Sequence, residues 1–315
     1  MKQYSQEQPL VSIYCLSYNH EKYIRDTLEG ILNQKVDFKY EVIIHDDAST
    51  DNSQAIIREY AEKYPDIIVP ILQKENQYSK GVKVFGEYIL PALRGRYAAT
   101  CECDDYWIDS NKLQKQVELL EERPDVSICG HAFYVVDGEK KILSTCNRFG
   151  KGSGEISEYD VILNEDLPQT ATFMYRTELR NQMDEFFYNC TVGDYPLNLY
   201  MITKGKYYYI DEIMSCYRRH GNGSWVTRMM NNEELFHKHL DSIAELFERY
   251  DEYTQRRYSD IIHMRQEKSN LMCLEREGMV LKYFSNPYFK TLSFKNKMIK
   301  IAKGCKTLSK KIISK

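Results

Sequence analysis

Three acidic side chains, Glu102, Asp104 and Asp105, lie within four residues of one another. They follow a short, mostly apolar stretch, 97–100, whose composition predicts a strand. Because side chains alternate across a strand, we expect Glu102 and Asp104 on one side, with Asp105 turning into the following loop. Clustered carboxylates without histidine or zinc-spaced cysteines suit Mg²⁺ or Mn²⁺, which proteins commonly share with substrate phosphates. The segment therefore predicts a divalent-cation site, the alternative being a solvated acidic loop.

A second acidic pair, Asp46 and Asp47, follows the stretch 41–44, which predicts a buried strand. A helix is expected to begin near Asn52, so the two aspartates lie in a strand-to-helix loop. In open α/β sheets, ligands bind outside the carboxyl ends of the strands, so two acid-tipped strands imply one shared crevice. Such a crevice is a typical place for a nucleotide.

The elements that must position these acids follow from the spacing of apolar residues. The N-terminal part alternates strands with helices, which predicts a parallel, helix-covered sheet. The expected strands are 11–17, 41–44 and 67–72, and the expected helices are 21–34, 52–63 and 82–93. Later segments predict a helix at 111–122, a short helix within 192–204, and strands at 126–136, 171–175, 207–210 and 213–217. The glycine-rich stretch 150–154 is expected to be a loop rather than a domain boundary.

Beyond residue 231 the sequence changes to charged helical segments, 233–250 and 254–284. We expect one α/β domain over 1–230 and a helical extension over 231–315, which offers a surface for a homo-oligomer. The tail 290–315 contains nine lysines and no acid, with isoleucine and leucine interleaved. Such a basic amphipathic tail can contact an anionic membrane, each lysine adding about 1 kcal/mol. A solvated, frayed C-terminus is an equal alternative.

Composition bounds the class of protein. The chain has 315 residues, 43% of them hydrophobic, which suffices for a sizeable core. Its net charge of −3 offers no electrostatic case for nucleic-acid binding. The nine cysteines are scattered and odd in number, which fits reduced thiols. Without a secretory signal in residues 1–8 or a run near the ~20 apolar residues of a membrane span, we expect a cytoplasmic protein.

Four linked pieces of sequence carry a family resemblance. They are the strand and loop 11–19, the segment DDASTD at 46–51, the acidic segment 101–107, and the helix that begins at Lys112 and Leu113. In this order and spacing they resemble glycosyltransferase family 2 with the GT-A fold, of the bacterial surface-polysaccharide type. The resemblance covers about the first 130 residues. It implies a Rossmann-like, mixed central sheet flanked by helices, with a nucleotide-binding half at about 1–130 and an acceptor-binding half at 131–230.

For the donor, the resemblance implies a nucleotide sugar, with uracil as the expected base. By position, the loop of Ser17, Tyr18 and Asn19 would face the base, and Tyr18 would be available to stack on it. Asp47 would accept a hydrogen bond from the base.

For the cation, the resemblance implies Mn²⁺ or Mg²⁺ bridging the two phosphates of the donor. Asp105 would bind it and Asp104 would contact the ribose side. Glu102 stands where the family's DxD motif has its first acid, so the direct ligand stays open between Asp104 and Asp105. The cation would stabilise the negative charge of the departing nucleoside diphosphate.

An inverting transfer needs a base that takes the proton of the acceptor hydroxyl, and Asp194 is the best candidate. Glycine before it permits close approach, and Pro196 suits the first turn of a helix. The resemblance places a catalytic acid in this region. The structural alternative for Asp194 is a helix N-cap, and the two roles can coexist.

The segment after the last predicted strand offers cations for the phosphates. Arg218, Arg219 and His220 could clamp the diphosphate, and the resemblance implies a histidine near the metal or diphosphate. As alternatives, the arginines could simply pair with surface acids.

The function that follows from the resemblance is an inverting, metal-dependent hexosyltransferase. It would move a sugar, expected from UDP, to a hydroxyl of a glycan or lipid-linked glycan in bacterial surface-polysaccharide synthesis, at the inner face of the plasma membrane. One rival is a nucleotidyltransferase, which would ordinarily show a glycine-rich, basic loop after the first strand, whereas this chain has Ser17 to His20 there. A second rival is a non-catalytic protein that binds nucleotide sugars.

Overall fold

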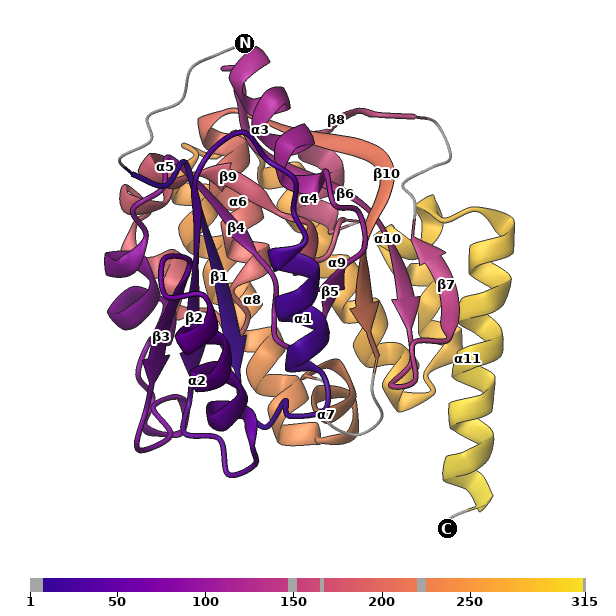
Figure 1. The fold of residues 1–315 in the computed structure, drawn as a ribbon. Coiled ribbons are helices and arrows are strands. Elements are labelled where there is room, and N and C mark those ends of the chain that lie inside the picture. The colour runs from indigo at the N-terminus through magenta and orange to yellow at the C-terminus, as the bar shows by residue number, and fades with distance from the viewer. Residues whose placement is uncertain (1–7, 147–151, 165–166, 220–224, 314–315) are drawn as a thin grey trace.

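A mixed ten-stranded sheet lies at the centre of the computed structural model, which describes residues 8–146, 152–164, 167–219 and 225–313 (Figure 1). The strand order along the sheet is β3-β2-β1-β4-β9-β6-β10-β5, with β7 paired to β6 and β8 paired to β10. The strands are β1 (Val11–Ser17), β2 (Tyr40–Asp46), β3 (Ile68–Leu72), β4 (Tyr97–Thr100), β5 (Tyr106–Trp107), β6 (Val126–Val136), β7 (Ile142–Cys146), β8 (Gly154–Ile156), β9 (Met174–Arg176) and β10 (Lys206–Arg218).

The N-terminal half of the sheet is parallel. β1 pairs in parallel with β2 and with β4, and β2 pairs in parallel with β3. The chain builds outward from β1 to β3 and then returns to the other side of β1 as β4. This change of direction makes a topological switch point between β1 and β4, where α/β sheets bind ligands.

The second half of the sheet is mixed, as predicted. β9 runs antiparallel to both β4 and β6, while β6 and β10 are parallel. The two strands predicted at 207–210 and 213–217 are one strand, β10, because register shifts at Ile210 and Ile213 interrupt the alternation without ending the pairing.

Helices cover both faces of the sheet (Figure 1). They are α1 (Ile24–Leu32), α2 (Ser53–Lys63), α3 (Lys112–Glu122), α4 (Glu158–Leu163), α5 (Thr177–Asn181), α6 (Asp194–Lys204), α7 (Trp225–Asn231), α8 (Glu233–Tyr253), α9 (Ser259–Glu277), α10 (Pro287–Thr291) and α11 (Phe294–Ile313). The helix predicted at 82–93 is wrong in type. The chain forms a π-helical turn, Phe85–Ile89, and a 3₁₀ turn, Leu90–Ala92, because Pro91 has no amide hydrogen to continue an α-helix.

Alternate residues of the central strands face two separate cores. Ile13 and Cys15 of β1 pack with side chains of α1, α2 and α3, whereas Tyr14 packs with side chains of α6, α8 and α9. Phe247 and Tyr250 of α8 are completely buried in the second core. The helices after residue 230 therefore complete one face of the sheet, and the domain boundary at 230 stays a prediction.

A third, smaller core lies among the last helices. Leu271 of α9 packs there with Tyr283 and Phe289, and Ile301 of α11 is half-buried against them. Within the described ranges, every helix is too short or too polar to span a bilayer. All nine cysteines are free thiols.

Candidate active site

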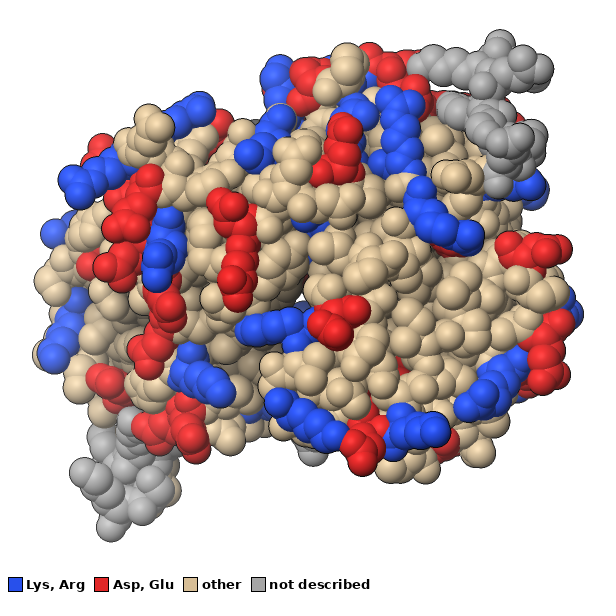
Figure 2. All heavy atoms as spheres, turned by 90° about the vertical axis from the view of Figure 1, so that its left-hand side faces the viewer, with Lys and Arg blue, Asp and Glu red and all other residues tan. Residues whose placement is uncertain are grey.

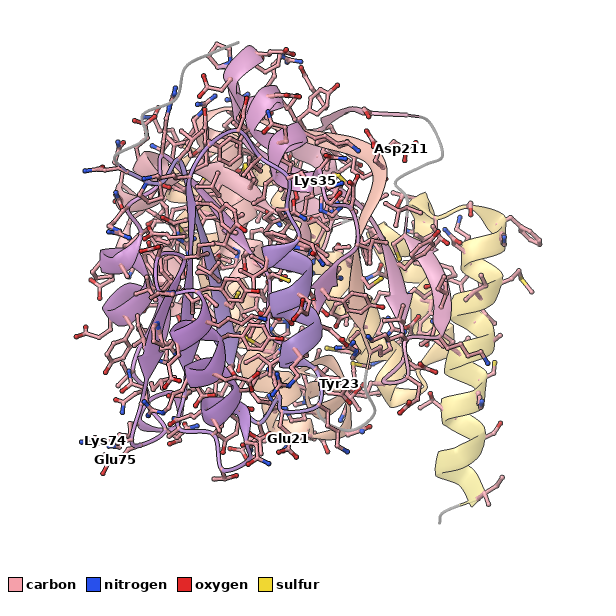
Figure 3. All side chains as sticks on the ribbon, viewed as in Figure 1. Glu21, Tyr23, Lys35, Lys74, Glu75 and Asp211 are labelled. Carbon is pink, nitrogen blue, oxygen red and sulfur yellow. The ribbon has the colours of Figure 1, made fainter. Side chains whose placement is uncertain are left out.

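The predicted site residues follow strands that end at one edge of the sheet. In Figure 3, Glu21 and Tyr23, which follow β1, lie at the lower end of the molecule together with Lys74, which follows β3. Lys35, between α1 and β2, lies at the opposite end. The parallel pairing of β1, β2 and β4 therefore brings the loops after all three strands together.

The three acids that follow β4 converge on one point. One carboxylate oxygen from each of Glu102, Asp104 and Asp105 lies within 4.8 Å of the other two. A tight turn causes this, because the amide of Asp105 donates to the carbonyl of Glu102 at 2.9 Å and folds the segment back. The hydroxyl of Thr27 in α1 fixes the turn by donating to the carbonyl of Asp105 at 2.6 Å. We call these three residues the acid cluster.

Burial and mutual repulsion change the protonation of the acid cluster. Burial, and then the charges of Asp104 and Asp194, raise the pKa of Glu102 to about 8. Burial and the charge of Asp104 also raise the pKa of Asp105 well above its ordinary value. Without a cation, these three carboxylates cannot all be ionised together, because their negative charges repel one another. A hard divalent cation would compensate that charge, and carboxylate oxygens are its preferred ligands.

Asp194 comes from a distant part of the chain to the same place. It is the first residue of α6, and its charge contributes to the raised pKa of Glu102, so the two carboxylates lie near each other. Its own pKa is raised because the group is buried. Gly193 occupies the N-cap position, and the Asp194 carboxylate accepts from the amide of Tyr195 at 2.8 Å. The structural alternative of Asp194 as the N-cap residue therefore does not fit the observed helix start.

The loop after β1 is joined to the loop after β2. Asn19 has a left-handed backbone, with φ of 59°. Its amide donates to the Ser49 hydroxyl at 2.8 Å, and its side-chain oxygen accepts from the Thr50 amide at 2.8 Å. Tyr18 is 47% exposed, so its ring is open to a ligand. The Ser17 hydroxyl is buried and has no hydrogen-bond partner among the described residues.

Both aspartates after β2 hold loops. Asp47 is buried, and its two oxygens accept from the amides of Gln77 at 2.7 Å and Tyr78 at 3.0 Å. Asp46 accepts from the amide of Ser49 at 2.9 Å. Each carboxylate oxygen has a second lone pair, so the predicted contact between Asp47 and a base stays a prediction.

Arg218 ends β10 and is turned into the protein. Its side chain is completely buried. The guanidinium donates to the carbonyl oxygen of Asp104 at 2.7 Å and to the carboxylate of Asp26 at 2.8 Å, and its backbone amide donates to the carboxylate of Asp105 at 2.7 Å. The rings of Tyr23 and Tyr106 lie within 4.9 Å of the guanidinium carbon. This burial argues against the predicted phosphate contact, because the arginine's hydrogen bonds are made to the turn that carries the acid cluster.

Two further residues were predicted to bind phosphates, and two residues that interact with the acid cluster or with Arg218 were not predicted. Arg219 is exposed, and His220 lies outside the described residues. His20 was missed, although it directly follows the predicted base-binding loop. Burial alone would lower the pKa of His20, but contact with the Cys103 thiol and the charge of Asp104 raise it above its ordinary value. Asp26, which anchors Arg218, carried no signal in the sequence because it looks like any acid in the first turn of a helix.

The chain matches the model of a known protein family. The model of the family described as glycosyl transferase family 2 matches residues 12–183. An uncharacterized protein of Mycobacterium tuberculosis is 35% identical over 241 residues, which cover 76% of this chain and 67% of that protein. The putative teichuronic acid biosynthesis glycosyltransferase TuaG of Bacillus subtilis is 37% identical over 131 residues, 41% of this chain and 50% of that protein.

Solved structures share the fold at low sequence identity. The mannosyltransferase PcManGT from Pyrobaculum calidifontis, in complex with GDP-Man and Mn²⁺, superposes with a TM-score of 0.58 at 14% identity, over 98% of this chain and 76% of that one. TarS 1–349 of S. aureus, in complex with UDP-GlcNAc, gives a TM-score of 0.55 at 16% identity, over 89% and 88% of the two chains. These matches confirm the predicted architecture, a mixed central sheet flanked by helices.

Proposed function

From the chain's membership of glycosyltransferase family 2, we propose an inverting, metal-dependent transfer of a sugar from a nucleotide-diphosphate donor. The chain has the GT-A fold and is a glycosyltransferase. The observation that carries this proposal is the meeting of the acid cluster with Asp194 at the edge where β1, β2 and β4 end. The acid cluster offers the ligands for a cation, and Asp194 offers a carboxylate that can act as a base.

Mn²⁺ or Mg²⁺ is the proposed cofactor. The acid cluster would hold it through Asp105 with Asp104 or Glu102, since its oxygen-only ligands and high negative charge suit these ions. When bound, the cation would offset the charge that develops on the leaving diphosphate. The protein presents the three carboxylates on one short turn, and hydrogen bonds from Thr27 and Arg218 hold that turn in place.

The donor would lie across the loops after β1 and β2. The exposed ring of Tyr18 is placed to stack on a base, and the unpartnered hydroxyl of Ser17 at the strand end offers a hydrogen bond. Asp47 would accept from the base edge while still holding the loop at Gln77. UDP is the proposed nucleotide, supported by the UDP-GlcNAc complex of the structural relative TarS. A GDP sugar is bound by the relative PcManGT, so both belong in a test.

Asp194 is the proposed catalytic base. Burial raises its pKa, which makes its carboxylate a stronger base than that of an exposed aspartate. At the start of α6 and near Glu102, it would take the proton of an acceptor hydroxyl on the side of the donor sugar away from the diphosphate.

For the acceptor we propose a hydroxyl of a glycan or lipid-linked glycan made for a bacterial cell surface. The name of the relative TuaG supports this class. The free cysteines support work in a reducing compartment, where nucleotide sugars would be the donors, and we therefore propose a cytoplasmic location.

The test is turnover of a panel of UDP-, GDP- and dTDP-sugars, with and without Mn²⁺ or Mg²⁺. We expect slow, cation-dependent release of free sugar and nucleoside diphosphate from one donor, abolished by Asp105→Asn and strongly reduced by Asp194→Asn. Asp66→Asn, an exposed acid between α2 and β3, is the matched control and should behave as wild type. Release of pyrophosphate would instead identify a nucleotidyltransferase, and tight donor binding without turnover, with acceptors present, would identify a binding protein.

A further inference from the structure

Exposed apolar side chains are concentrated in the last part of the chain. Among the described residues, eight of the sixteen exposed large apolar side chains lie in residues 279–313. Phe294 is 81% exposed, and Leu281 and Phe284 in the turn before α10 are also exposed. Single exposed apolar residues are ordinary, but such a concentration in one segment indicates a contact surface.

Along α11 these side chains form a stripe. Phe294, Met298 and Cys305 are separated by four and seven residues, so they share one face of the helix, and all three are exposed. The neighbouring face packs inward, where Ile301 contacts the third core and Gly304 lies against Tyr283. Figure 1 shows α11 at the side of the molecule farthest from β3, with its last turns extending past β7. The stripe therefore borders the packed face and has no covering element among the described residues.

The charge of this segment is opposite to that of the rest of the chain. Residues 290–315 carry nine lysines and no acid, and because the whole chain has a net charge of −3, the remainder carries −12. Lys295 and Lys306 each follow a stripe residue by one position and so line its outer edge, and both are exposed, as is Lys303. The opposite side of the molecule, in Figure 2, instead shows lysine, arginine and acidic side chains interspersed.

We propose that α11 docks the protein on an anionic lipid bilayer. Its apolar–lysine surface consists of the stripe (Phe294, Met298 and Cys305) and the adjoining Lys295 and Lys306. An apolar stripe flanked by lysines is the pattern of a helix that lies in the plane of a membrane surface, with apolar side chains among the acyl chains and ammonium groups at the lipid phosphates. An acidic body behind a cationic helix favours one orientation, since anionic lipid attracts the helix and repels the remainder.

The test is co-sedimentation of the full chain with phosphatidylcholine vesicles, with and without phosphatidylglycerol, in the absence of donor and cation. We expect binding only to the vesicles that contain phosphatidylglycerol. Phe294→Ser with Met298→Ser should weaken it by roughly tenfold or more, since two exposed apolar side chains lose their burial. Lys295→Gln with Lys306→Gln should weaken it about 30-fold, and added salt should weaken the wild type in the same way.

The matched control is Lys35→Gln with Lys39→Gln, two exposed lysines between α1 and β2 and outside α11, which should leave vesicle binding unchanged (Figure 3 labels Lys35). Equal binding to phosphatidylcholine alone, or equal losses in the control and the α11 variants, would overturn the proposal. If Phe294→Ser with Met298→Ser instead dissociates a dimer in sedimentation velocity without changing vesicle binding, the occupant is a second copy of the chain. None of these readouts depends on the proposed sugar transfer.

Discussion

Arg218 is the residue whose position connects the end of β10 to the acid cluster. Three of its donors reach the segment 104–105 or Asp26, and a planar guanidinium between two tyrosine rings is a fixed support. We therefore assign it a positioning role, in which it holds the turn that presents Asp104 and Asp105 rather than touching the donor.

Replacing this arginine should weaken cation binding. Arg218→Lys keeps the charge but cannot make both guanidinium contacts, so we expect Mn²⁺ affinity to fall about 10- to 100-fold, with a parallel loss of kcat. Isothermal titration of Mn²⁺ into the protein measures this directly. Arg219→Lys, at the exposed neighbour, is the control and should bind Mn²⁺ as wild type does. An unchanged Mn²⁺ affinity in Arg218→Lys would remove the positioning role.

The pKa of Glu102, about 8, predicts that cation binding depends on pH. The folded-state pKa is raised, so below pH 8 the group holds a proton that a cation must displace, and apparent Mn²⁺ affinity should rise between pH 6.5 and 8.5. The same shift means that the metal-free protein loses stability as pH rises from the ordinary glutamate range through 8. Glu102→Gln should flatten both profiles. A wild-type Mn²⁺ affinity that is constant over this range would contradict the prediction.

At the scale of single residues, the sequence predicted which residue types lie in the site but not the direction in which each side chain points. The acids of 46–47 and 102–105 could be brought together because parallel strands end at a common edge. The direction of the Arg218 side chain could not be foreseen, because it depends on Asp26 and Tyr23, which are almost 200 residues away in sequence and carry no motif.

Among the elements, the loops after β1 and β2 act as one unit because Asn19 joins them. Its left-handed backbone suits asparagine or glycine, and its side chain holds the amide of Thr50. The loops that would receive the donor's base are therefore ordered before any ligand arrives.

Asn19→Ala should strain the backbone and remove the side-chain hydrogen bond to the Thr50 amide. We expect a loss of about 1–2 kcal/mol in the free energy of unfolding, measured by urea denaturation, and about a fivefold increase in KM for the donor. Asn19→Gly separates the two causes, because it relieves the backbone strain and still lacks the hydrogen bond to Thr50. Wild-type stability and KM in Asn19→Ala would show that the loops are held by other contacts.

Helices and strands could be predicted where the spacing of apolar residues followed one pattern without interruption. The alternating strand and helix segments from 11 to 63 were found in place, whereas the helix expected at 82–93 is broken by Pro91 into π and 3₁₀ turns. The strands expected at 207–217 fuse into β10 because a bulge hides continuous pairing from a strict two-residue pattern.

For the whole molecule, the helices beyond residue 230 are part of the main core. Ile243, Phe247 and Tyr250 of α8 are buried with the side chains of α6 against one face of the sheet. Such non-local packing is invisible to sequence patterns, which show a helix and its apolar face but not the partner of that face.

Truncation after Met230 should therefore fail to give a cooperatively folded protein, because it exposes this core. Truncation after Leu292 removes α11 alone and should retain a cooperative urea transition, since α11 contacts the third core and not the sheet. Circular dichroism during urea denaturation distinguishes the two. A soluble 1–230 fragment with one sharp transition would instead support an independent domain ending at residue 230.

The separation of charge along the chain gives the molecule a permanent electric dipole, with a cationic end at α11 and an acidic body. In the field of a charged surface such a dipole experiences a torque, and that field is felt over a Debye length of about 8 Å at physiological salt. The molecule would therefore rotate before it touches, so that collisions with an anionic layer are biased toward one face. Rotational diffusion near such a layer, rather than the final contact alone, would then select the orientation in which the protein arrives.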